Sequence, residues 1–98
     1  MAIYIIRGTV TGHVKIGYSG NVERRLQNIQ TACSEPIELL EVCPLGDRST
    51  ERRLHRQFRW YRIHGEWFKP EGDMWAWVAR LKDKINRKNL EAMRHGWL

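Results

Sequence analysis

The chain has 98 residues, which is enough for one domain with one modest hydrophobic core. Its 17 Lys and Arg outnumber 11 Asp and Glu, so the net charge is +6 and the pI is near 9.8. That charge suits a polyanionic partner, either nucleic acid or an anionic membrane surface, although a merely soluble basic protein has it too. Two cysteines are too few for a disulfide scaffold, and no apolar run approaches the ~20 residues of a membrane span. We therefore expect an intracellular, cytoplasmic protein.

The first third of the chain predicts a β-hairpin followed by a helix. Two β-branched runs, residues 3–8 and 13–18, flank a turn signal at Thr11-Gly12. A helix-capping signal at residues 19–21 comes next, and the apolar residues after it recur at the spacing of one helical face. These apolar residues are Val22, Leu26 and Ile29.

A third strand and a second helix are expected in the middle of the chain. Residues 34–36 end the first helix, and residues 37–42 form another apolar run of strand length. Ser49 or Thr50 is expected to cap a second helix that runs to about Trp60. The cysteines lie beside apolar residues and are expected to be small core residues: Cys33 and Cys43.

The last third predicts a short extended piece and a third helix. Residues 63–68 are extended and are ended by Pro70 and Gly72. Asp73 is expected to cap the third helix, whose apolar periodicity fades from Asn86 onward. The apolar face of this helix consists of Met74, Trp77, Val78, Leu81 and Ile85.

The order of these elements predicts an α+β fold, because hairpin strands and a third strand are covered by helices. We expect a small domain over residues 1–86, with a three-stranded, mainly antiparallel sheet flanked by helices. Residues 87–98 are expected to form a basic C-terminal tail.

Five short motifs occur in one order along the chain: Ala2-Ile3-Tyr4, Lys15-Ile16-Gly17, Glu23-Arg24-Arg25-Leu26, ERRLHRQF from Glu51 to Phe58, and Gly65-Glu66-Trp67-Phe68. The first two resemble the GIY and YIG elements of the GIY-YIG nuclease superfamily. The later ones are similar to its T5orf172 or MUG113-like branch. The resemblance covers residues 3–68 and implies a GIY-YIG-like domain that acts as a metal-dependent endonuclease, a hydrolase of phosphodiester bonds in DNA.

This chain departs from the family pattern in three places. Ala2 replaces the glycine of the first motif, where only a strand position is involved. Lys15 replaces the first tyrosine of the second motif, which changes the chemistry. The asparagine that many members carry late in the domain has no clear counterpart here.

The resemblance makes Tyr4 the expected general base for the attacking water. A free phenol is a poor base at neutral pH, because its pKa is about 10. If the hairpin register places Lys15 opposite Tyr4, the ammonium lowers that pKa and supports catalysis. A tyrosine in a strand is otherwise most often a core residue.

Three further residues are assigned to the reaction by the same resemblance. Arg25 borders the buried face of the first helix, and its guanidinium can hold two phosphate oxygens. Glu51 and His55 are four residues apart and share one helical face. A lone carboxylate with waters and substrate oxygens is the usual way to hold Mg²⁺, so Glu51 is expected to bind Mg²⁺ or Mn²⁺ and His55 to assist. The alternative is a solvated, arginine-rich helix face.

Positive charge concentrates in two stretches that can follow phosphates. Residues 48–62 hold six Arg and one acid, and residues 80–98 hold six Lys or Arg and two acids. Such contacts give salt-sensitive affinity that is largely independent of sequence, so specificity would come from a homodimer or a partner protein. The residues expected to contact nucleic acid are Gly17, Tyr18, Arg24, Arg52, Arg56 and Arg59.

Two other functions stay open at this point. Lys15 and the missing asparagine favour a catalytically weak or inactive module that binds nucleic acid without cutting it. A small phage-type regulator that binds a protein is the other alternative. In the last motif, Trp67 and Phe68 are expected to be core residues, and Glu66 is a second acid that either joins the site or lies outside it.

Overall fold

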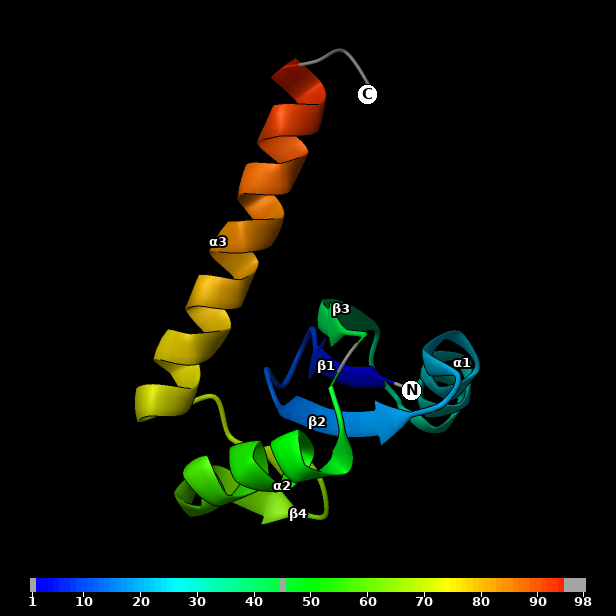
Figure 1. Cartoon of the computed structure of the whole chain (residues 1–98), viewed down its shortest axis with the longest axis vertical. Helices are drawn as coiled ribbons and strands as arrows, with labels where there is room; N and C mark the ends of the chain where they lie inside the picture. The colour runs from blue at the N-terminus through cyan, green and yellow to red at the C-terminus, as the bar shows by residue number, and fades with distance from the viewer. Residues whose placement is uncertain (1, 45, 95–98) are drawn as a thin grey trace.

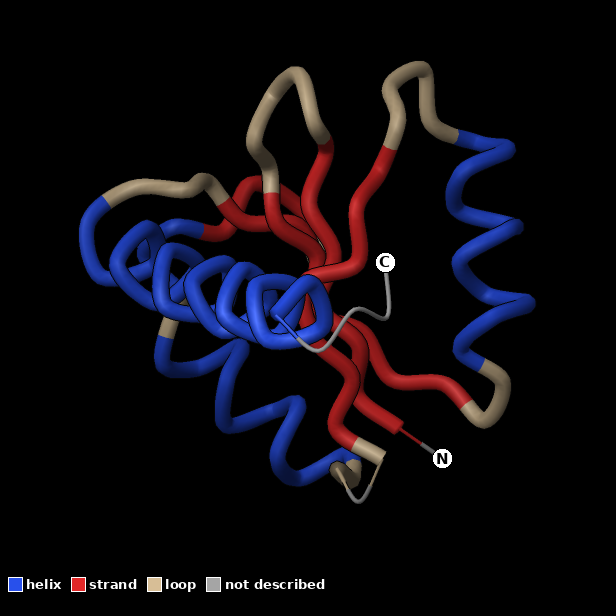
Figure 2. Tube along the Cα trace, turned by 90° about the horizontal axis from the view of Figure 1, so that it is seen from above, coloured by secondary structure: helices blue, strands red, loops and turns tan. Residues whose placement is uncertain are grey.

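The computed structural model describes residues 2–44 and 46–94, with side chains as far as residue 83. Figures 1 and 2 show a sheet with one helix on one side and two helices on the other. The elements are β1 (Ala2–Gly8), β2 (Val14–Ser19), α1 (Val22–Ala32), β3 (Ile37–Cys43), α2 (Arg48–Gln57), a 3-10 turn (Arg59–Tyr61), β4 (Arg62–His64), β5 (Trp67–Phe68) and α3 (Gly72–Arg94).

The sheet has five strands in the order β3-β1-β2-β5-β4, and every neighbouring pair is antiparallel. The predicted α+β class is confirmed, but the expected three-stranded sheet is wrong. Residues 62–68 form the hairpin β4–β5, which joins β2 through Val14 with Phe68 and Lys15 with Trp67. Strands of two or three residues are too short for a periodic pattern, so their pairing depends on tertiary contacts.

The register of the β1–β2 hairpin sorts its side chains onto two faces. Tyr4 pairs with Gly17, and Ile6 pairs with Lys15. Because directly paired residues point to the same side of a sheet, these four share one face. On that face Ile6 borders the same groove as Leu26, which places α1 over the β1–β3 side.

The hydrophobic core lies on the opposite face, beneath α2 and α3 (Figure 2). The expected apolar face of the third helix is confirmed for its described side chains, since Met74 and Val78 are fully buried and Trp77 packs against them. The side chain of Ile85 lies outside the described part of the chain. The buried core residues are Ile3, Ile5, Val14, Ile16, Leu40, Phe58, Phe68, Met74, Val78 and Leu81.

The helix that carries Glu51 begins two or three residues earlier in the chain than expected. The cap is Asp47 rather than Ser49 or Thr50. Its carboxylate accepts hydrogen bonds from the Thr50 N–H at 2.9 Å and from the Ser49 and Thr50 hydroxyls at 2.8 and 3.0 Å. These bonds hold the pKa of Asp47 down to about 2. Ser49 and Thr50 are not the cap, because they donate hydrogen bonds to the carboxylate of Asp47, which is the cap.

The ends of two helices also differ from the pattern. The second helix ends at Gln57, and a 3-10 turn carries the chain to Tyr61. The third begins at Gly72, so Asp73 lies in its first turn, and it continues beyond Asn86 to Arg94. Good helix formers such as Lys, Arg, Leu, Glu, Ala and Met dominate this last stretch and sustain a helix where apolar periodicity has faded.

Neither cysteine is among the buried core residues. Cys33 follows α1 and is half-buried, whereas Cys43 is exposed at the end of the edge strand β3. The expectation that Cys43 is a core residue is therefore wrong, because an edge strand leaves one of its sides uncovered. In the described part of the chain no helix is both long and apolar enough to cross a membrane.

Candidate active site at the edge of strand β2

Tyr4 is a buried residue whose ring lies against the neighbouring strand. It is 1 % exposed, and its Cα partner on β2 is Gly17. A β-carbon built on Gly17 would collide with Cζ and the hydroxyl of Tyr4. The ring therefore crosses β2 directly above its backbone, and the phenol reaches toward the side of β2 that faces away from β1.

That outer side of β2 is paired with another strand only in part. β5 covers it at Val14 and Lys15 and stops there. Beyond this point the Ile16 N–H donates to the Glu66 carbonyl oxygen at 3.1 Å, and His55 Nε2 lies 2.9 Å from the Ile16 carbonyl oxygen. One residue of β2 therefore holds both Glu66 and His55 beside the strand.

Helix α2 runs alongside the same edge. At its start, the Arg48 guanidinium lies 5.3 Å from the ring centroid of Tyr18. Two turns later, His55 contacts Ile16. Glu51 lies between these two contacts, which places it beside the part of β2 that carries Gly17 and the Tyr4 phenol. Because Glu51 and His55 share one helical face, both lie beside β2.

The charges around Tyr4 show which side chains gather at this edge. The pKa of Tyr4 is raised to about 12, first by burial and then by the carboxylates of Glu66 and Glu51, whereas the Arg25 guanidinium acts to lower it. Glu66, Glu51 and Arg25 are thus all close enough to the phenol to influence its pKa. We use "edge cluster" for the set that meets here: Tyr4, Arg25, Glu51, His55 and Glu66.

Lys15 does not take the place that was expected for it. The register sets it opposite Ile6, so the condition for direct pairing with Tyr4 is not met. Its ammonium instead pairs with the Glu66 carboxylate at 3.0 Å and lies 5.4 Å from the centroid of the Trp67 indole. Since the pKa of Tyr4 is raised and Lys15 is not among the causes, Lys15 does not shift Tyr4 toward a phenolate.

The contact of His55 defines its tautomer. A carbonyl oxygen can only accept, so Nε2 must donate its hydrogen to Ile16. The neutral ring then keeps its basic lone pair on Nδ1. The ring also meets Phe68 edge-on, with centroids 5.2 Å apart, so its orientation is fixed from two directions.

Glu51 has the properties of a carboxylate that is available to a hard cation. It is half-buried in the first turn of α2, and its carboxylate makes no hydrogen bond or ion pair with the residues that the structure describes. No group of three or more His, Cys, Asp or Glu suited to a metal occurs among those residues. A site with a single protein carboxylate fits Mg²⁺, which keeps several waters and takes further oxygens from phosphates.

The other predicted contact residues divide into buried and exposed ones. Gly17 is buried beneath the Tyr4 ring, and Tyr18 packs on the opposite, core face. Arg52 and Arg59 are exposed and donate to backbone carbonyls of Arg48 and Arg56. Arg25 is exposed too, so its guanidinium is accessible to a ligand. The remaining exposed arginines of the predicted set are Arg24 and Arg56.

The sequence indicates the roles of Glu66 and Gly17 less clearly than those of the other site residues. The sequence does not decide whether Glu66 joins the site, but in the structure it is among the causes of the Tyr4 pKa shift and it pairs with Lys15. The sequence predicts that Gly17 contacts nucleic acid, and the structure shows that its missing side chain leaves room for the Tyr4 phenol. Trp67 is only half-buried, so its expected place in the core is wrong, while Phe68 is fully buried as expected.

The antiparallel sheet and the helices that cover it form a small α+β domain. A family model described as the T5orf172 domain matches residues 1–88, and the chain belongs to this family. The family is GIY-YIG-like and associated with nucleases, which is consistent with a nuclease or nucleic-acid-binding role. No match to a curated protein or to a solved structure was found.

Proposed function

We propose that this protein is an endonuclease that hydrolyses phosphodiester bonds in DNA with the help of one divalent cation. The observation that carries the proposal is the convergence of Tyr4, Arg25 and Glu51 from three separate elements. All three lie close enough for the two charges to shift the pKa of Tyr4. Hydrolysis of a phosphodiester requires groups that bind the phosphate and stabilise the charge of the transition state. A hydrogen-bond donor, a cation and a carboxylate that can hold a metal ion meet this requirement.

The scissile phosphate would bind between α1 and α2. Arg25 is the exposed cation of the edge cluster, and its planar guanidinium can hold two non-bridging oxygens at once. It offsets the negative charge that develops on them. The exposed arginines of α2 would carry the neighbouring phosphates, with a salt dependence that follows the number of contacts.

Glu51 would hold Mg²⁺ or Mn²⁺. Such an ion, when bound, polarises the phosphate and stabilises the leaving oxygen. The half-buried carboxylate without an ion pair in the described part of the chain supports this assignment. Glu66 is less suited to the task because it is already paired with Lys15.

The proton of the attacking water is better assigned to His55 than to Tyr4. With a pKa of about 12, Tyr4 is a neutral phenol at neutral pH and acts as a hydrogen-bond donor to the phosphate or the water. A tyrosine base would need a nearby cation to dominate, and both carboxylates of the edge cluster act in the opposite direction. Imidazole exchanges protons near neutral pH, and Nδ1 of His55 is its basic nitrogen.

A binding module that grips nucleic acid without cutting it is the second candidate. The raised pKa of Tyr4 and the engagement of Lys15 with Glu66 favour it, because neither prepares a phenolate. It leaves unexplained why a half-buried carboxylate stands beside Arg25 and Tyr4, where bound phosphates would be repelled.

A nicking assay distinguishes the two candidates. Purified protein is incubated with supercoiled plasmid in Mg²⁺, Mn²⁺ or EDTA, beside Glu51→Gln and the control Glu71→Gln, whose side chain is exposed before α3. We expect metal-dependent nicking that Glu51→Gln reduces by at least a hundredfold and Glu71→Gln leaves intact. DNA binding without cleavage in every metal would instead establish the binding module.

A further inference from the structure

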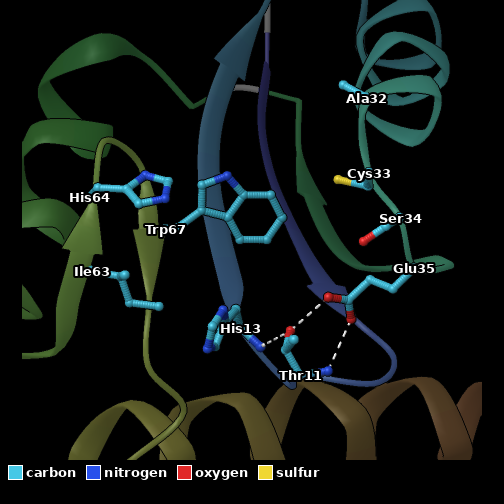
Figure 3. Close-up of a pocket in the computed structure, with 9 residues that line it drawn as sticks. All are labelled: Thr11, His13, Ala32, Cys33, Ser34, Glu35, Ile63, His64 and Trp67. Atoms are coloured by element: carbon cyan, nitrogen blue, oxygen red, sulfur yellow. Dashed lines mark hydrogen bonds between the residues drawn. The ribbon is translucent and has the colours of Figure 1, made fainter.

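A second concavity lies on the same face of the sheet as Tyr4, next to the edge cluster. It has a volume of about 290 Å³ and opens between the end of α1 and the β4–β5 hairpin (Figure 3). This size is at the small end of ligand sites and suits one flat ring system better than a large cofactor. The residues that line it are Thr11, His13, Ala32, Cys33, Ser34, Glu35, Ile63, His64 and Trp67.

One wall of this concavity is built to be rigid. The Glu35 carboxylate accepts hydrogen bonds from the backbone N–H groups of Val10 and Thr11 at 2.9 and 3.0 Å, and from the Thr11 hydroxyl at 2.9 Å. These bonds lower the pKa of Glu35 and tie the β1–β2 turn to the segment after α1. Figure 3 shows the hydrogen bonds between Thr11 and Glu35 at the lower edge of the concavity.

The other wall is formed by Trp67, which the sheet places close to the edge cluster. Trp67 pairs with Lys15 on β2, and Gly17 follows two residues later on the same face. Two residues of a strand span about 7 Å. The indole and the Tyr4 phenol above Gly17 are therefore neighbours along one strand. In Figure 3 the indole lies between His64 and the segment of Cys33 to Glu35.

The chemistry of the lining selects an uncharged aromatic ligand. No Lys or Arg is among the lining residues, and the one carboxylate, Glu35, would repel a phosphate. The indole and the imidazoles of His13 and His64 offer flat surfaces for stacking, and the imidazoles and the Ser34 hydroxyl offer hydrogen bonds to ring edges. A nucleobase has this combination of a flat face and polar edges.

We infer that this concavity receives one unpaired nucleobase of the strand held at the edge cluster, stacked on Trp67. This inference rests on the proposed function and specifies its substrate. A base inside a duplex cannot reach a pocket unless it is turned out of the stack, which costs energy. The protein therefore favours single-stranded DNA, or DNA with an unpaired base beside the scissile phosphate, over a regular duplex.

Binding measurements test the inference without relying on cleavage. The full chain carrying Glu51→Gln is titrated, with EDTA present, into fluorescein-labelled single strands that contain one abasic site at successive positions, and into a matching duplex. We expect tighter binding to the single strand and one position where the abasic site weakens binding by about tenfold, since stacking on an aromatic side chain contributes strongly to affinity.

Two variants assign the effect to Trp67. Trp67→Leu should weaken binding to the intact strand about tenfold and abolish the further effect of the critical abasic site, whereas Trp67→Phe and the exposed control Trp75→Leu should bind nearly as the parent does. Equal affinity of Trp67→Leu and Trp75→Leu, or an abasic effect that persists in Trp67→Leu, would overturn the inference. Failure of the nicking assay leaves this readout intact, so the two proposals fail separately.

Discussion

The phenol of Tyr4 occupies the space where Gly17, its partner on the adjacent strand, would carry a β-carbon. A side chain of one motif thus dictates the residue type in the other. Both residues are buried, so neither has room to move away. The glycine is required here by the ring beside it, and not by a turn, because no positive φ occurs at this position.

Gly17→Ala should therefore displace the Tyr4 ring. We expect a loss of stability of about 1–3 kcal/mol, typical of an overpacked site, and a fall in nicking. Chemical unfolding measures the first and the plasmid assay the second. The double variant Tyr4→Ala, Gly17→Ala should be more stable than the sum of the single losses predicts. Additive losses would show that the two side chains do not compete for one space.

Tyr4→Phe should change the stability of the protein at high pH. The pKa of Tyr4 is raised from 10.0 to about 12, so its stabilising effect is fully present below pH 10 and is lost as the pH rises toward 12. The parent should lose on the order of 2 kcal/mol more than Tyr4→Phe across this window. Urea unfolding at pH 9, 10, 11 and 12 measures the difference. Parallel curves for both proteins would show that the phenol is not shielded from solvent.

Replacing the Lys15–Glu66 pair one residue at a time should reveal how Lys15 acts. Lys15→Met leaves the Glu66 carboxylate uncompensated in the edge cluster, so its negative charge should repel the phosphate that is proposed to bind there and lower nicking. Stability should fall by no more than about 1 kcal/mol, because both side chains are partly exposed. The double variant Lys15→Met, Glu66→Gln should recover part of the activity. If the double variant is no better than Lys15→Met, the lysine has a role of its own in the reaction.

Two substitutions of His55 should distinguish its effect on stability from its effect on catalysis. His55→Ala leaves the Ile16 carbonyl without its donor and should cost about 1–3 kcal/mol. His55→Gln can still donate to that carbonyl, so it should restore much of the stability while nicking stays at least a hundredfold low. Tyr4→Phe should retain more activity than His55→Gln at pH 7. The reverse order of the two variants would return the role of general base to Tyr4.

Much of the fold follows from local pattern. The hairpin, the first helix with its Asn21 cap and the third strand appear where alternation, helical spacing and turn residues indicate them. These features depend on neighbours within a few residues. The hairpin β4–β5 depends on contacts with β2, some fifty residues earlier in the chain, and short strands carry no signal of such pairing.

In the site, too, some features follow from local spacing and others depend on long-range pairing. The shared helical face of Glu51 and His55 is a property of one helix, so spacing alone indicates it. The partner of Lys15 is decided by strand register, because one step along β2 separates a residue opposite Tyr4 from one opposite Ile5. Without the register, a lysine two residues before Gly17 is easily assigned to the wrong neighbour.

The two hydrogen bonds of Ile16 make the site dependent on the register of β2. Its N–H is satisfied by Glu66 and its carbonyl by His55, which come from a hairpin and a helix that form later in the chain. Neither Glu66 nor His55 can be placed until β2 is paired with β1 in the native register. The edge cluster should therefore form only together with the sheet, and a chain whose β2 lies in another register should lack it.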